Sequence, residues 1–235
     1  MKTASLIDRL MMFGMTRQEA QIYLCLAQNN ELSGYEVSKI TGISRSNVYS
    51  ALARLVEEGA AYLLEGNANK YVSVDVSEFC QNKIRHLTET KESLKRDMPQ
   101  LKNTCDGYIT ISGHQHIMDR IHYMLENVVY RVYISMPITF LEQFREDIMK
   151  LLTAEKKVVL IISQPQDYPG SIQYITDRQD MQLRLIVDSE YVLTGDMTGS
   201  ADDTCLYCGQ PNFVNVFKEA MGNEIKLIEL KGNKS

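Results

Sequence analysis

Residues 33–55 have the sequence SGYEVSKITGISRSNVYSALARL, which predicts two short helices joined by a tight turn. Ser33 and Ser44 are the N-cap candidates, because a serine hydroxyl accepts a hydrogen bond from the free N–H groups of a first helical turn. Residues 41–43 separate the helices, and a short turn with a small residue holds the helices of a helix-turn-helix at a steep angle. The second helix would bury apolar residues that recur at helical spacing, which are Val48, Ala51, Leu52 and Leu55. The stretch therefore predicts a helix-turn-helix with helices over residues 33–40 and 44–58.

The flanking residues extend this motif to a winged helix over residues 1–75. Thr16 and Glu19 have the spacing of a capping box at the start of another helix. After Gly59, two extended runs, residues 60–64 and 70–74, enclose the sequence EGNAN. Its residues tolerate positive φ, as a hairpin turn requires. We expect this hairpin to form the wing.

The first turns of the second helix are the expected DNA-reading surface, because such a helix inserts its N-terminal end into the major groove. Arginine can bind guanine, asparagine can bind adenine, and serine and tyrosine commonly hold phosphates. Each side chain taken singly also fits an ordinary solvated helix face, so the interpretation rests on the turn, caps and wing together. The candidate DNA-binding residues are Ser33, Ser44, Arg45, Ser46, Asn47, Tyr49, Ser50, Arg54, Asn67, Asn69 and Lys70.

Charge argues mildly against DNA binding. The net charge is −5, and residues 1–75 contain seven Lys and Arg against eight Asp and Glu. Non-specific affinity for DNA comes from basic groups that neutralise phosphates. Any DNA binding must therefore depend on few basic groups and on a second subunit.

Residues 76–106 form a predicted helical connector. Apolar residues alternate at spacings of four and three, which is typical of a coiled-coil seam. Lys91 interrupts the seam, and Pro99 should end the helix near Met98. The alternative is a lone amphipathic helix packed on its own domain. The seam predicts a homodimer, with Ile84, Leu87, Leu94, Met98 and Leu101 as the dimerisation residues.

From residue 107 to 235 the pattern alternates between strands and helices, which predicts an α/β domain with a central sheet covered by helices. The expected strands cover residues 108–112, 132–135, 157–163, 183–187, 191–193 and 204–207, with a last extended run at 225–230. The expected helices cover residues 113–129, 140–152 and 211–221.

Two stretches of the N-terminal part resemble the TrmB family of prokaryotic regulators. Residues 14–24, GMTRQEAQIYL, are similar to the family's opening G-L-T-x-x-E-A-x-x-Y-L, and residues 43–49, ISRSNVY, are similar to its recognition segment V-x-R-S-x-V-Y. The resemblance covers about residues 5–75. It implies a winged helix, binding to double-stranded operator DNA as a dimer, and transcriptional control. An inverted repeat is the operator expected for a dimer.

Residues 181–198 resemble the phospholipase D-like motif H-x-K-x4-D-x6-G-S-x-N. Asp188 and Gly195 match its aspartate and glycine, but Met181 and Leu183 stand in place of the nucleophilic histidine and the phosphate-binding lysine. Phosphodiester chemistry then lacks both its nucleophile and the cation that holds the phosphate. The resemblance implies a phospholipase D-like fold without catalytic residues, used to sense a small-molecule effector. The alternative is a phosphodiesterase or nuclease.

A second alternative is a metal or thiol redox sensor. His114, His116 and His122 lie close in sequence, with Asp119 between them, but a solvated helix start is the favoured interpretation. Cys205 and Cys208 form a single CxxC, which is half a zinc site. A strand-edge position with both thiols buried is the favoured interpretation, so no metal or cofactor is expected. Tyr168, Tyr174 and Tyr191 could line a pocket or simply pack.

The remaining features predict a cytoplasmic protein with reduced thiols. No apolar run approaches the roughly 20 residues that span a bilayer. Residues 1–9 carry charges and lack the apolar core of a secretion signal. The five cysteines are odd in number and irregularly spaced.

Overall fold

The computed structural model describes residues 2–66, 68–99, 107–177 and 181–232. The chain divides into two compact units, Met1–Leu101 and Lys102–Ser235. Each unit has its own hydrophobic core.

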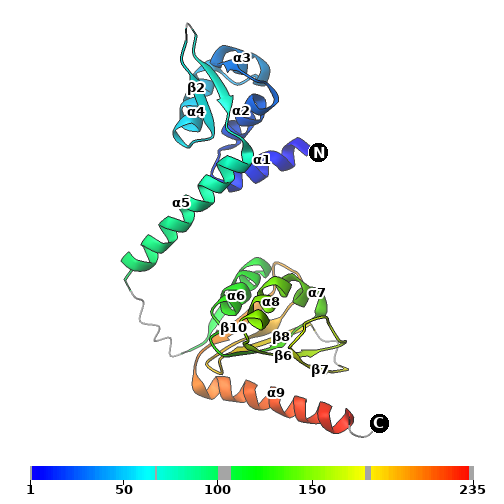
Figure 1. The fold of residues 1–235 in the computed structure, drawn as a ribbon. Coiled ribbons are helices and arrows are strands. Elements are labelled where there is room, and N and C mark those ends of the chain that lie inside the picture. Colours follow the sequence, from blue (N-terminus) through cyan, green and yellow to red (C-terminus); the bar gives the residue numbers. More distant parts are fainter. Residues whose placement is uncertain (1, 67, 100–106, 178–180, 233–235) are drawn as a thin grey trace. The chain divides into compact units, whose positions relative to one another are not determined.

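Unit 1 is a winged helix followed by a long helix (Figure 1). A small sheet of order β1-β3-β2 packs beside the first four helices, and all its strand pairs are antiparallel. The predicted caps are confirmed, because Thr16, Ser33 and Ser44 each accept a hydrogen bond from the third residue of the following helix. The elements are α1 (Lys2–Met12), α2 (Arg17–Gln28), β1 (Leu32–Ser33), α3 (Gly34–Thr41), α4 (Arg45–Glu57), β2 (Ala61–Leu64), β3 (Lys70–Ser73) and α5 (Val76–Asp97).

Two glycines set the geometry between α3 and α4. Gly42 ends α3 at φ +73°, a left-handed conformation that glycine adopts without strain. Gly34 lies under the ring of Tyr49, and a Cβ at this position would come within 2.5 Å of the ring. A side chain there would push α4 away from α3. The close packing of the two helices therefore depends on Gly34.

The long helix α5 is anchored only at its start. Phe79 is buried against Phe13 and Tyr23, with ring centroids 6.3 and 6.2 Å apart. Lys83 then pairs with Glu58 at 2.6 Å. The helix ends at Asp97, with Met98 as C-cap, which confirms the predicted termination before Pro99.

Unit 2 has three layers (Figure 1). Its mixed seven-stranded sheet has the order β4-β10-β9-β8-β5-β6-β7, in which β5, β6 and β7 run parallel. Helices α6, α7 and α8 cover one face, and α9 covers the other. The strands are β4 (Ile109–Ser112), β5 (Arg131–Ser135), β6 (Lys157–Ile162), β7 (Ile172–Ile175), β8 (Gln182–Val187), β9 (Tyr191–Asp196) and β10 (Thr204–Cys208). The helices are α6 (His114–Glu126), α7 (Ile138–Leu141), α8 (Arg145–Thr153) and α9 (Pro211–Gly232), with a 3₁₀ turn, Glu142–Phe144, before α8.

The extended run predicted over residues 225–230 is wrong, because these residues continue α9 to Gly232. Phe217, Met221, Ile225 and Ile228 recur at spacings of four and three, which is the helical period, and pack on the sheet. The short run of alternating residues in 225–230 fitted a strand only when it was separated from this longer pattern.

Three further expectations differ from the structure. The edge position predicted for the CxxC is wrong, because β10 lies between β4 and β9. The helix predicted over residues 140–152 is broken at Glu142–Phe144. Strand β7 was not predicted, since its four residues have only a weak apolar pattern and lie half-buried.

Candidate DNA-binding interface

The first two turns of α4 present a polar surface. Arg45, Ser46, Asn47, Tyr49 and Ser50 are all exposed. The opposite face of the helix is buried in the core, through the four apolar residues predicted for it. The local geometry follows from the sequence, because the apolar stripe fixes which face of the helix looks outward.

Arg45 is held by an aromatic partner on α3. Its guanidinium carbon lies 4.4 Å from the centre of the Tyr35 ring, and the Tyr35 side chain is 51% exposed. Lys39 lies one turn after Tyr35 on the same helix and is also exposed. Neither Lys39 nor Arg45 forms an ion pair within the described part of the chain. Both cations are therefore free to meet phosphate or base edges.

Tyr35 and Lys39 were not among the sequence-based candidates. Both residues lie on the first helix of the helix-turn-helix, whereas the expected DNA-reading surface lies on the second. An exposed aromatic residue two positions after the N-cap Ser33, with a lysine four residues later, is the signal that could have found them.

Four other candidate residues have partners inside the protein. Ser33 and Ser44 are helix caps. The guanidinium of Arg54 lies 3.3 Å from a carboxylate oxygen of Glu19, whose side chain is only 7% exposed. Lys70 pairs with Glu31 at 3.1 Å on the surface.

The other carboxylate oxygen of Glu19 accepts the N–H of Thr16, so Arg54 neutralises a buried capping residue. In the wing, Asn69 is exposed, and Asn67 lies outside the described residues. The structure thus brings Arg45 against Tyr35 and leaves Asn47 and Tyr49 exposed on the same helix, whereas Arg54 pairs with Glu19 of α2.

The apolar seam of α5 lies open to solvent within its own unit. The exposed fractions are 54% for Ile84, 58% for Leu87, 54% for Leu94 and 58% for Met98. Leu101 lies outside the described residues. The contacts of α5 with its own unit that the described residues show come from its first two turns, through Phe79 and Lys83.

In unit 2, the motif-like residues have structural roles. Leu183 is fully buried in the core, and Met181 lines a crevice of about 340 Å³ at the carboxyl ends of β5 and β6. A Cβ on Gly195 would collide with the backbone of β10, so this glycine permits the close approach of β9 and β10.

Asp188 is a structural anchor in the turn between β8 and β9. Its carboxylate accepts the N–H groups of Val129, Tyr130 and Arg131 at 2.8, 2.7 and 2.9 Å. Burial acts to raise the pKa of Asp188, but these hydrogen bonds outweigh burial and hold the pKa below its ordinary value. The three bonds occupy both carboxylate oxygens, which explains an aspartate here without any catalytic role.

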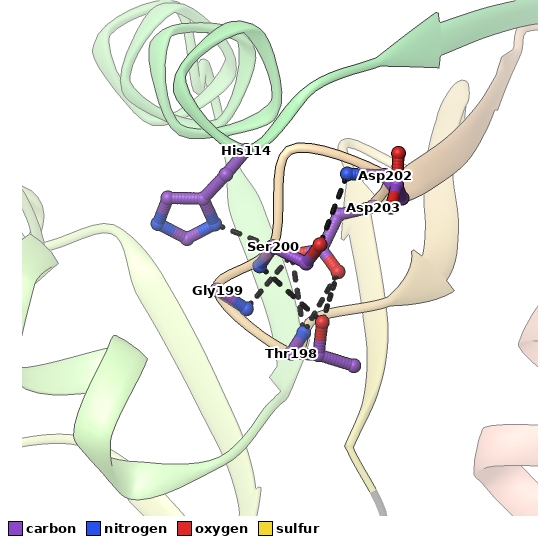
Figure 2. A network of polar contacts seen from close by, with 6 residues as sticks. All are labelled: His114, Thr198, Gly199, Ser200, Asp202 and Asp203. Atoms are coloured by element: carbon purple, nitrogen blue, oxygen red, sulfur yellow. Dashed lines mark hydrogen bonds and ion pairs between the residues drawn. The ribbon is translucent and has the colours of Figure 1, made fainter.

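Asp203 organises the loop between β9 and β10, as Figure 2 shows. It accepts the Thr198 hydroxyl and the backbone N–H groups of Thr198 and Gly199, and it lies 3.4 Å from the His114 ring. Burial acts to raise its pKa, yet the hydrogen bonds lower the pKa below its ordinary value. Figure 2 shows Asp202 on the same loop, where it is exposed.

The three histidines do not converge. His114 faces Asp203, whereas His122 lies 2.5 Å from Asp147 and against the Phe144 ring. Asp119 accepts a hydrogen bond from Gln115. In the part of the chain that the structure describes, no group of three or more His, Cys, Asp or Glu could hold a metal ion.

The CxxC thiols are buried, as expected. Burial raises the pKa of Cys205 to about 12, and neighbouring carboxylates add to this effect. A thiol with such a pKa is protonated at neutral pH and is a poor nucleophile and metal ligand. The three tyrosines also separate, because Tyr168 is buried in the core, Tyr174 contacts Glu229, and Tyr191 stacks on Tyr207.

Two family models match the chain. The model described as sugar-specific transcriptional regulator TrmB matches residues 10–77. The model of the N-terminal subdomain of the TrmB EBD matches residues 107–221.

Similar proteins include YrhO of Bacillus subtilis, 26% identical over 160 residues that cover 67% of this chain and 57% of YrhO. TrmBL1 of Pyrococcus furiosus, an HTH-type sugar sensing transcriptional regulator, is 25% identical over 170 residues that cover 70% of this chain and 49% of TrmBL1. The chain thus spans about half the length of these relatives. Among solved structures, TrmBL2, described as an archaeal chromatin protein, aligns with 95% of this chain and 98% of its own, at 18% identity and a TM-score of 0.44.

Proposed function

The chain belongs to the TrmB family of transcriptional regulators, and from this premise we propose that it is a sequence-specific, DNA-binding transcriptional regulator. The observation that carries the proposal is the polar start of α4, where Arg45 lies over the Tyr35 ring and Asn47 is exposed. Stacking restrains a long side chain before DNA arrives, so less conformational entropy is lost on binding.

The proposed binding mode places the start of α4 in the major groove. Arg45 and Asn47 would contact base edges, since these side chains form paired hydrogen bonds with guanine and adenine. Tyr49, Ser46 and Ser50, with Lys39 on α3, would contact phosphates, and Asn69 of the wing would contact the flanking groove. For Arg54 and Lys70, binding to DNA would first require breaking their ion pairs with Glu19 and Glu31.

We further propose that the functional form is a homodimer joined through α5. Four apolar side chains more than half exposed along one seam support this step, because burying them in a second copy removes apolar surface from water. Two winged helices would then bind an inverted repeat, whose half-sites lie one helical turn apart, about 34 Å, or a multiple of that.

The C-terminal unit is proposed to sense a small-molecule effector without catalysing a reaction. Buried Leu183 and exposed Met181, at the positions of the motif's lysine and histidine, support this role. No helix in the described residues is long and apolar enough to cross a membrane. We place the protein in the cytoplasm, where it would meet DNA.

The test is operator selection from a random DNA pool at one stated salt concentration, with the stoichiometry of the complex measured. We expect an enriched inverted repeat bound by two subunits. Arg45→Ala should weaken binding to the selected site by about 1–3 kcal/mol and relax specificity at one base pair. Arg17→Ala is the matched control, because Arg17 is an exposed arginine of α2 that pairs with Asp8 of α1.

Two results would contradict the proposal. The first is a monomer at micromolar concentration that enriches no sequence. The second is an equal loss of affinity in the Arg45 and Arg17 variants, which would mean that only net charge matters.

A further inference from the structure

A pocket of about 630 Å³ lies in unit 2, between the start of β4, helix α6 and the turn that joins β8 to β9. Its volume falls within the roughly 300–1,000 Å³ of small-molecule sites. The pocket is separate from the crevice that Met181 lines. Among its lining residues are Arg120, Tyr123, Glu190, Tyr191 and Tyr207.

Arg120 is the cation of this pocket, and its charge is not neutralised by the protein. Its guanidinium carbon lies 3.8 Å from the centre of the Tyr207 ring and 5.4 Å from that of Tyr123. It forms no ion pair among the described residues, and its Nε is shielded from solvent without a hydrogen-bond partner. A half-buried guanidinium without an ion pair among the described residues favours an incoming anion, because charged hydrogen bonds are strongest where water is excluded.

The carboxylates that also line the pocket leave this cation free. Asp188 directs both oxygens at three backbone N–H groups. Glu190 is exposed in the turn. Neither is paired with Arg120, so the carboxylate of a ligand would not displace an existing ion pair.

Two of the tyrosines stack on each other beside Arg120. The rings of Tyr191 and Tyr207 stack with centroids 5.7 Å apart and only 6° between their planes. Gly209 permits this arrangement, because a Cβ there would lie 2.9 Å from the Tyr191 ring. Since Arg120 already lies over the Tyr207 ring, the exposed ring of Tyr191 is the aromatic surface on which a flat ligand ring can pack.

We propose that this pocket binds a small organic anion, a carboxylate or phosphate ester on a flat ring, with Arg120 holding the charged group and Tyr191 packing against the ring. Binding itself does not depend on the proposed regulator function. Only the further step, that the anion changes affinity for DNA, rests on that function.

The test is calorimetric titration of the full chain with phenyl phosphate and with benzoate. Benzyl alcohol supplies the ring without the charge, and inorganic phosphate supplies the charge without the ring. We expect both aromatic anions to bind with a Kd of about 1 mM or tighter. The neutral alcohol and the free phosphate should each bind at least about tenfold more weakly.

Arg120→Gln should weaken binding of both aromatic anions by about tenfold or more. Arg145→Gln is the matched control, because Arg145 also lies over a tyrosine, Tyr168, but pairs with Asp167 and does not line the pocket. Circular dichroism checks that both variants fold. Glu190→Gln should strengthen binding by removing a nearby negative charge, and this variant tests the site even where loss of Arg120 perturbs folding.

The proposal is overturned if no aromatic anion binds at about 10 mM, a concentration that detects even weak sites. Equal binding by Arg120→Gln and the original chain, or equal binding of benzyl alcohol and phenyl phosphate, also overturns it. If inorganic phosphate binds tightly and the aromatic anions do not, the pocket is a phosphate site and the proposal of a ring-bearing ligand is overturned. A repeat with the selected operator separates the two proposals, because an anion that binds without altering DNA affinity refutes only the regulatory step.

Discussion

At the scale of single residues, some of the seven basic residues in 1–75 form ion pairs within the fold and others form none among the described residues. Arg17, Arg54 and Lys70 are paired with carboxylates, whereas Lys39 and Arg45 are not. Arg45 relies instead on Tyr35, an interaction worth about 0.5–1 kcal/mol at exposed sites. With a near-neutral domain, the unpaired cations supply the positive charge that DNA would meet.

This difference in pairing predicts that two arginines of the same helix contribute unequally to the free energy of unfolding. Arg54→Ala should lower the free energy of unfolding by about 1 kcal/mol, because it leaves the buried Glu19 carboxylate without its cation. Arg45→Ala should change it by less than about 0.5 kcal/mol. Urea unfolding of each variant measures both values, and equal losses would contradict the assignment.

A second prediction concerns the loop in Figure 2. Asp203→Ala should destabilise the protein by about 1–3 kcal/mol, because the N–H groups of Thr198 and Gly199 lose their acceptor. Asp202→Ala removes an exposed carboxylate from the same loop and is the control, with little expected effect. Thermal unfolding compares the two variants, and similar melting temperatures would refute the role of Asp203.

At the scale of elements, the helices and most strands could be predicted from caps and periodicity, because those signals are local. The capping box at Thr16 and the cap at Ser44 specified helix starts directly. Strand order could not be predicted, since it depends on contacts between distant segments, and α9 was cut short by a strand-like run within its helical pattern. The exposed face of α4 could be predicted from its apolar stripe. The contact of Arg45 with Tyr35 could not, because it depends on how α3 and α4 pack against each other.

Helix α5 carries a prediction at this scale. Leu87→Glu should convert the proposed dimer to a monomer, because it places like charges opposite each other in the seam. Arg85→Glu introduces the same side chain off the seam and should leave the dimer intact. Sedimentation over a range of concentrations measures both, and a Leu87→Glu protein that remains dimeric would locate the dimer interface elsewhere.

At the scale of the whole molecule, both cores should lose stability at alkaline pH, because each contains a buried group with a raised pKa. Burial raises the pKa of Tyr23 in unit 1 from 10.0 to about 12, and that of Cys205 in unit 2 from 9.0 to about 12. A raised pKa in the folded state contributes stability below the unfolded value, and this stability is lost as pH rises toward the folded value. Burial also raises the pKa of Cys25 and Cys80 in unit 1 above their ordinary value of 9.0, so both units should begin to lose stability above about pH 9.

Urea unfolding at pH 7, 9.5 and 11 tests this expectation, with Cys205→Ala and Tyr23→Phe as the variants that should each reduce the pH dependence of one unit. A single transition that shifts uniformly with pH in all three proteins would contradict independent cores.

The anchoring carboxylate of Asp188 has a consequence for the kinetics of folding. Its hydrogen bonds connect residues 57–59 positions apart in sequence, so they can form only after β5 and β8 have come together. A contact that forms late in folding slows unfolding more than it speeds folding. Asp188→Ala should then shorten the lifetime of the folded sheet by raising the unfolding rate, while the refolding rate stays nearly unchanged. A residue that resembles part of a catalytic motif would thus act as a latch on the sheet.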